Sequence, residues 1–105
     1  MFCGMDLGSR AVKIVLHDGQ KVREEKIVET ARFYKTCGKH SNAGFAVDFD
    51  ALLTETPTSV TVTGYGRNSL TIVDAEIISE LKAHMLGAVW QTGLTDFTLL
   101  DLGGQ

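Results

Sequence analysis

The sequence predicts an α/β domain with a mixed sheet in the order β-β-β-α-β-α-β and helices packed on that sheet. Three observations predict it. Residues 2–33 hold three runs of strand character separated by turn residues, residues 45–55 and 72–92 place apolar residues at helical spacing, and a Thr/Val run at 58–63 lies between them. With 105 residues, of which 44% are hydrophobic, the chain has the size of one modest domain.

The first three strands follow from local pattern. Residues 2–7 are largely apolar and end at a glycine, which predicts a buried strand. Residues 11–17 alternate apolar and polar side chains, and Asp18 with Gly19 then predicts a hairpin turn. Residues 21–33 alternate with interleaved charges, so we expect a long edge strand there.

The middle of the chain is expected to change from loop to helix. Residues 34–44 have loop composition, and Cys37 and His40 within them are too few to predict a metal site. Residues 45–55 predict a short helix that stops before Pro57.

The last elements are a strand, a long helix and a strand. Residues 58–63 are followed by a glycine-containing turn, and the apolar stripe of residues 72–92 predicts a helix that covers the sheet and ends at Gly93. Residues 96–102 then predict a strand that delivers Asp101.

Composition excludes several classes of partner. The net charge of −3, without clustered Lys or Arg, argues against nucleic acid. No apolar run approaches the roughly 20 residues of a membrane span, and no leader pattern is present, so we expect a cytoplasmic protein without a membrane partner. Cys3 and Cys37 are too few for a disulfide framework and are expected to be reduced.

The turn after the first strand has the residues of a phosphate site. Asp6 ends the strand and can hold a hydrated Mg²⁺, while backbone N–H groups around Gly8 and Ser9 can approach phosphate oxygens. Lys13 adds a positive charge for phosphate. A bare Asp-x-Gly turn is by itself more often structural.

The end of the chain repeats this design. Residues 99–104 again place an acid, an apolar residue and a glycine after an apolar strand, with Asp101 in the place of Asp6. Two such turns facing each other could hold one nucleotide between them.

Two further features have a functional and a structural interpretation. The glycines at 64 and 66 follow a predicted strand, where α/β sheets place ligand contacts, although a plain loop would look the same. Glu80 and His84 are neighbours on one helix face, and a solvated or interface pair is the favoured interpretation.

Four motifs in this order and spacing resemble one ATPase family. They are Gly4-Met5-Asp6-Leu7-Gly8-Ser9 with Lys13, Val62-Thr63-Gly64-Tyr65-Gly66-Arg67, Ile78-Ser79-Glu80-Leu81 with His84 and Gly87, and Leu100-Asp101-Leu102-Gly103-Gly104-Gln105. The family activates 2-hydroxyacyl-CoA dehydratases and forms ATP-hydrolysing subunits of benzoyl-CoA reductase. The resemblance implies half of a ribonuclease H-like fold, as in actin, heat-shock chaperones and sugar kinases.

The resemblance also implies a function and a site. ATP hydrolysis would drive low-potential electron transfer from a [4Fe–4S] cluster to a dehydratase or reductase, with catalysis by electrostatic positioning. Asp6 and Asp101 would be the catalytic acids and would hold Mg²⁺ through water. The implied ATP- and phosphate-binding residues are Gly8, Ser9, Arg10, Ala11, Val12, Lys13, Gly103, Gly104 and Gln105. The implied cleft or interface residues are Gly64, Tyr65, Gly66, Arg67, Glu80 and His84.

The chain departs from the family in two ways. Arg10, Ala11 and Val12 stand where the family has small hydroxyl residues, which leaves backbone contact to phosphate. Family members also continue into a second copy of the fold, which holds the adenosine site and the cluster cysteines. We therefore expect residues 1–94 to form a first subdomain and residues 95–105 to open a missing second one. The chain would contribute no iron–sulfur ligand and show no appreciable ATPase activity alone.

Two other functions stay open. The first is a non-catalytic docking or assembly domain of the same fold, and the second, less favoured, is a small-molecule kinase of the superfamily. Because residues 97–102 lack their family partners, that strand either joins the sheet of this domain or pairs with a second copy to form a homodimer.

Overall fold

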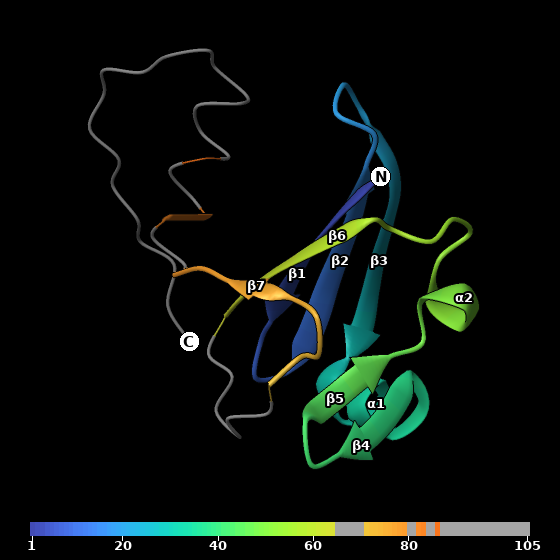
Figure 1. The fold of residues 1–105 in the computed structure, drawn as a ribbon, viewed down its shortest axis with the longest axis vertical. Helices are drawn as coiled ribbons and strands as arrows, with labels where there is room; N and C mark the ends of the chain where they lie inside the picture. The colour runs from blue at the N-terminus through green and yellow to red at the C-terminus, as the bar shows by residue number, and fades with distance from the viewer. Residues whose placement is uncertain (65–70, 80–81, 84–85, 87–105) are drawn as a thin grey trace.

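A five-stranded mixed sheet forms the centre of the protein (Figure 1). The computed structural model describes residues 1–64, 71–79, 82–83 and 86. In the sheet order β3-β2-β1-β6-β7, β1 is antiparallel to β2 and parallel to β6, β2 is antiparallel to β3, and β6 is parallel to β7. The strands are β1 (Phe2–Leu7), β2 (Ala11–His17), β3 (Val22–Glu29), β6 (Ser59–Gly64) and β7 (Glu76–Ile77). The predicted α/β fold class is confirmed.

The turn between β2 and β3 is the hairpin that the sequence predicts. Gly19 has a φ of +100°, which favours glycine. The Asp18 carboxylate accepts hydrogen bonds from the backbone N–H groups of Lys21 at 2.9 Å and Gln20 at 2.8 Å. These two bonds hold the pKa of Asp18 below its usual value. Local turn chemistry therefore determines this part of the sheet.

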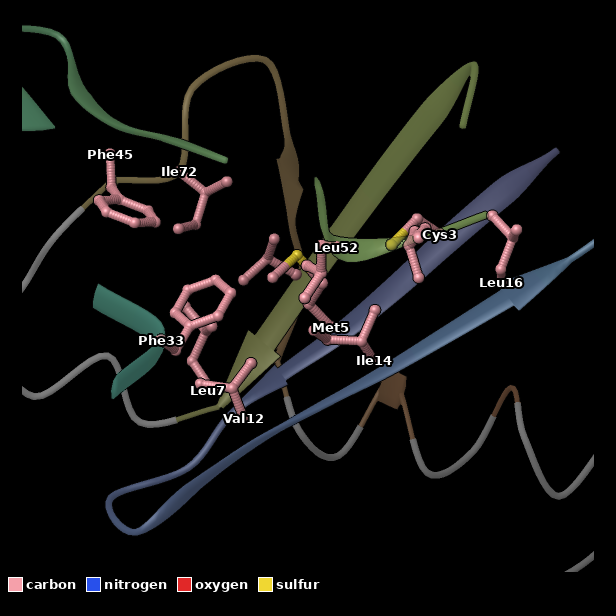
Figure 2. Packing of buried hydrophobic residues seen from close by; sticks show 12 residues of the cluster. Cys3, Met5, Leu7, Val12, Ile14, Leu16, Phe33, Phe45, Leu52 and Ile72 are labelled. Carbon is pink, nitrogen blue, oxygen red and sulfur yellow. The ribbon is translucent and has the colours of Figure 1, made fainter. Parts of the chain in front are cut away.

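The hydrophobic core lies on one face of the sheet (Figure 2). Alternate residues of β1, β2 and β6 point to it, as the period of two requires. Side chains from the segments that cross this face complete the core. The buried residues are Cys3, Met5, Leu7, Val12, Ile14, Leu16, Phe33, Phe45, Leu52, Leu53, Val62 and Ile72. The opposite face of the sheet, here called the outer face, carries Asp6 and Lys13.

The predicted long edge strand at 21–33 and the predicted loop at 34–44 are wrong in part. The strand β3 ends at Glu29, and the chain continues as α1 (Thr30–Thr36) and the hairpin of β4 (Gly38–Ser41) and β5 (Gly44–Val47). In Figure 1, α1 and this hairpin lie together beyond the end of β3. The reason is burial of Phe33 and Phe45, whose ring centroids lie 5.4 Å apart and which are both fully buried.

The predicted helix at 45–55 is also shorter in the structure. Only α2 (Phe49–Leu52) is helical, and Asp48 caps it by accepting a bond from the Ala51 N–H at 3.2 Å. The next residues leave the helix because Thr54 donates both its N–H and its hydroxyl to the Glu24 carboxylate on β3, each at 2.9 Å. This tertiary contact ends the helix after one turn.

The predicted helix at 72–92 begins later than expected. Ile72 forms an isolated bridge with Phe45, and β7 follows at Glu76–Ile77. Asp74 has a φ of 60°, which a helix cannot contain. Ser79 then caps a helical stretch, since its hydroxyl accepts from the Lys82 N–H at 3.1 Å. The rest of the predicted helix, its end at Gly93 and the strand 96–102 lie outside the described residues.

Candidate functional site

The outer face of the sheet aligns three polar side chains from three strands. Asp6 on β1 pairs with Lys13 on β2 and with Thr63 on β6. Paired residues of neighbouring strands share one face, and the strands lie about 4.8 Å apart. Asp6 is half-buried and Lys13 is exposed. A carboxylate, an ammonium group and a hydroxyl therefore stand in one row at the end of β1.

The β1–β2 turn needs glycine at position 8 for space. The Gly8 N–H donates within the turn, to Asp6 O at 3.1 Å and to Ala11 O at 3.0 Å. A Cβ on Gly8 would lie 2.5 Å from Ala11 O. Because the Gly8 amide is used inside the turn, the role of Gly8 is to shape the turn.

Thr30, the first residue of α1, holds this turn. Its hydroxyl donates to Gly8 O at 2.8 Å, and its N–H donates to Arg10 O at 2.9 Å. All described peptide bonds are trans, and in a trans peptide the C=O and the N–H point in opposite directions. The N–H groups of Ser9 and Ala11 are therefore directed away from Thr30. The sequence analysis missed Thr30, because nothing near it in the sequence indicates a contact across 22 positions.

Thr30→Val is expected to loosen the turn, because the Gly8 carbonyl loses its hydroxyl partner. We expect the free energy of unfolding to fall by about 1 kcal/mol, with faster hydrogen exchange at the Ser9 amide. Urea denaturation and amide exchange followed by NMR measure the two effects. Thr36→Val is the control, since its hydroxyl bonds Arg32 O inside α1, where such a bond adds little stability. Equal effects of the two variants would contradict the anchoring role.

The end of β6 lies against Asp6 and requires glycine. Gly64 has a φ of +109°. A Cβ on Gly64 would lie 2.5 Å from Leu7 O, 2.6 Å from Leu7 N and 2.8 Å from Asp6 Oδ1. The absence of a side chain at Gly64 thus leaves room for the Asp6 carboxylate.

Thr63 belongs to a motif that the sequence analysis names, but it is given no role of its own there. Its hydroxyl oxygen is buried and has no hydrogen-bond partner among the residues that the structure describes. A Thr in a Thr/Val strand carries no sequence signal of function, because its β-propensity explains it. Only the pairing of β6 with β1 places it beside Asp6.

The other predicted site residues are not placed. Tyr65, Gly66, Arg67, Glu80, His84, Asp101, Gly103, Gly104 and Gln105 lie outside the described residues. The structure brings together Asp6, Gly8, Lys13 and Gly64, with Ser9 and Arg10 exposed on the turn. Ala11 and Val12 begin β2, and the Val12 side chain is in the core, so only its backbone could contact a ligand.

The two cysteines have different settings. Cys3 is buried in the core, and burial raises the pKa of its thiol to about 11, so it stays protonated at neutral pH. The sulfur of Cys37 lies 3.6 Å from the hydroxyl of its neighbour Thr36. Within the described ranges, no three His, Cys, Asp or Glu side chains converge on one point. The helices of this part of the chain also fall short of the length and apolar character that a membrane crossing requires.

Comparison with known proteins finds a relative by sequence. No family model matches the sequence. The (R)-2-hydroxyglutaryl-CoA dehydratase activating ATPase of Acidaminococcus fermentans is 32% identical over 105 residues, which are 97% of this chain and 38% of that protein. The chain is homologous to part of this activating ATPase.

The fold agrees with this homology. The crystal structure of (R)-2-hydroxyglutaryl-CoA dehydratase component A from the same organism superposes with a TM-score of 0.54 and 27% identity. The match covers 88% of this chain and 35% of component A. The five-stranded mixed sheet thus corresponds to part of an actin-like ATPase fold. The chain spans little more than a third of the length of the activating ATPase.

The residues at the end of β1 fit the Mg²⁺ and nucleotide that an ATPase of this kind uses. Asp6 supplies carboxylate oxygens, which Mg²⁺ prefers as ligands. Gly8 allows the tight turn after Asp6, Gly64 leaves room for the Asp6 carboxylate, and Thr63 has a buried hydroxyl without a partner in the described chain. The described residues do not fit a [4Fe–4S] cluster, because such a cluster is held by four thiolates and the described chain offers two cysteines, of which Cys3 is a buried, protonated thiol.

Proposed function

We propose that this chain is the nucleotide-binding first part of an ATP-dependent activator, which couples ATP hydrolysis to low-potential electron transfer toward a 2-hydroxyacyl-CoA dehydratase or benzoyl-CoA reductase. The observation that carries the proposal is the row of Lys13, Asp6 and Thr63 beside the Gly8 turn. The homology to the activating ATPase supports it. The partner enzyme and its acyl-CoA substrate follow only from that homology.

Each residue of the site has a separate task. The Asp6 carboxylate holds Mg²⁺ through water, and Mg²⁺, when bound, offsets the negative charge of the phosphates. Lys13 adds a second positive charge on the neighbouring strand. The N–H groups of Ser9 and Ala11, turned away from Thr30, donate to phosphate oxygens. Catalysis would then come from positioning and electrostatics, without a covalent step on the protein.

The remaining residues of the proposed site belong to the part of the chain that the structure does not describe. Asp101 is proposed as the second acid near the Mg²⁺, and Gly103, Gly104 and Gln105 as the second phosphate turn. Tyr65, Gly66, Arg67, Glu80 and His84 are proposed to line the cleft or a partner interface. Residues 95–105 would open a second subdomain, so two opposed turns would enclose the phosphates.

Titration of Mg-ADP into this 105-residue chain tests the proposal. We expect NMR shifts at the amides of Ser9 and Ala11, because these groups would donate to the phosphates, and we expect Asp6→Asn to remove the shifts. Asp18→Asn is the control, since it changes an acid in a turn at the other end of β2 and should leave the shifts unchanged.

Phosphate release from ATP, measured on the same samples, is expected to stay at background. Two results would contradict the proposal. The first is an unchanged spectrum at the β1–β2 turn, and the second is robust hydrolysis by this chain that Asp6→Asn abolishes, which would overturn the view that a second part is needed.

A docking or assembly domain is the second candidate, and one observation favours it. Phe2, Val22 and Ile27 lie on the outer face and are 53%, 41% and 72% exposed. Phe2 and Val22 flank His17 on neighbouring strands, and a contiguous apolar patch is typical of an interaction surface. An apparent molar mass from light scattering that rises with protein concentration would favour this candidate and a homodimer over nucleotide binding, provided that the chain also shows no response to Mg-ADP.

A further inference from the structure

The Thr63 hydroxyl is a buried polar group in the described chain that the proposed roles leave unused. Its oxygen is shielded from solvent and has no partner among the described residues. Burying a hydroxyl without a hydrogen bond lowers stability, and such groups are rare in folded proteins. A valine would fill nearly the same volume in this strand without that cost. The position therefore carries a polar group for which the described residues supply no hydrogen-bond partner.

Thr63 lies beside Asp6 in the sheet. The parallel register places the two residues side by side on the outer face, one strand spacing apart. The next residue, Gly64, has no side chain, and its Cα lies so close to the Asp6 carboxylate that a Cβ would be 2.8 Å from Oδ1. Thr63 and Gly64 thus form one wall of the space around this carboxylate.

We propose that Thr63 is a positioning residue for the hydrated divalent cation held by Asp6: its hydroxyl hydrogen-bonds a water of the cation's hydration shell. This inference rests on the proposed nucleotide site and names a residue of that site on β6. An Asp that contacts Mg²⁺ through water leaves several waters in the shell, and each water needs hydrogen-bond partners. Groups that orient metal-bound ligands from the second layer commonly change metal affinity tenfold or more.

The test compares two replacements of Thr63 with a control one row away. The probe is Mn²⁺ with ADP, and free Mn²⁺ is measured by electron paramagnetic resonance. We expect Thr63→Val to weaken Mn²⁺ binding about tenfold, and Thr63→Ser, which keeps the hydroxyl, to bind like the parent chain. Thr61→Val is the matched control, because Thr61 lies on the same face of β6 but pairs with Gly4 instead of Asp6.

A thermal melt without ligand separates positioning from structure. Because the Thr63 hydroxyl has no partner in the described chain, Thr63→Val should melt at the same temperature as the parent chain or higher. Weaker Mn²⁺ binding together with unchanged or raised stability, rescued by serine, is the expected result.

Three outcomes would overturn the inference. Parent-like binding by Thr63→Val, with binding lost in Asp6→Asn, would remove Thr63 from the site and leave the proposed function standing. A lower melting temperature in Thr63→Val that parallels the loss of binding would show a structural role. No Mn²⁺ binding by the parent chain in the presence of ADP would overturn this inference and the proposed function together.

Discussion

Gly64→Ala is expected to lower the free energy of unfolding by about 2–4 kcal/mol, the sum of a strained φ and an overpacked contact. The φ of +109° lies in the region that side chains rarely adopt. The new Cβ would also stand 2.5 Å from Leu7 O and 2.6 Å from Leu7 N, and these backbone atoms cannot move aside as a flexible side chain could. Urea denaturation followed by circular dichroism measures the loss.

The same substitution should impair the site. The new methyl group would lie only 2.8 Å from Asp6 Oδ1, which is too close for a non-bonded contact. The Asp6 carboxylate would therefore have to turn away. Residual folded Gly64→Ala protein at low temperature should therefore bind Mn²⁺ with ADP more weakly than the parent chain.

Gly4→Ala is the matched control for both effects. Gly4 lies on β1 two residues before Asp6, and a Cβ there would meet nothing within 4 Å. We expect Gly4→Ala to be neutral or to stabilise the chain by a few tenths of a kcal/mol up to about 1 kcal/mol. If Gly64→Ala proves as stable as Gly4→Ala, the close approach of β6 to Asp6 is wrong.

Phe45→Ala is expected to cost about 3–5 kcal/mol, as removal of a fully buried aromatic side chain does. The Phe45 ring is 0% exposed and lies 4.8 Å from the ring centroid of His40, 5.2 Å from Tyr34 and 5.4 Å from Phe33. These contacts attach the β4–β5 hairpin to α1. A domain of this size has roughly 5–15 kcal/mol of stability, so the loss is a large fraction of it.

The consequence of Phe45→Ala should be greatest in the hairpin. Hydrogen exchange should accelerate at the Phe45 and Val73 amides, which bond Thr71 O and Phe45 O. Phe2→Ala is the control, because Phe2 is 53% exposed and its removal should cost less than about 1 kcal/mol. Equal destabilisation by the two Phe variants would show that Phe45 does not hold the hairpin in place.

Local pattern was sufficient for the first half of the sheet. The alternation of β2 and the turn at Asp18 and Gly19 both depend on residues that are close in sequence. The same holds for the phosphate-type turn, since Asp6, Gly8 and Lys13 lie within one hairpin. The fold class and these three residues could therefore be proposed before the structure.

The secondary structure of residues 30–47 was determined by tertiary contacts. Its charges and alternation are compatible with a strand and a loop. Burial of Phe33 against Phe45 favours a helix followed by a hairpin instead. In the same way, Ile72 and Ile77 fit the apolar stripe of a helix. In the structure Ile72 instead forms a bridge with Phe45 of β5, and Ile77 lies in β7, which pairs with β6.

The sequence by itself determined the α/β class, the β1–β2 turn and the candidate roles of Asp6 and Lys13, because turn chemistry and strand periodicity are local. Only the tertiary structure decided that Thr30 anchors this turn and that Thr63 and Gly64 stand beside Asp6. Those contacts join residues far apart in the sequence. The Thr30–Gly8 hydrogen bond spans 22 positions, and the Thr58–Met1 hydrogen bond, which also joins the start of β1 to the segment before β6, spans 57. Parallel pairing of β1 with β6 has no turn to fix its register, so burial of Met5 and Val62 on the opposite face selects it.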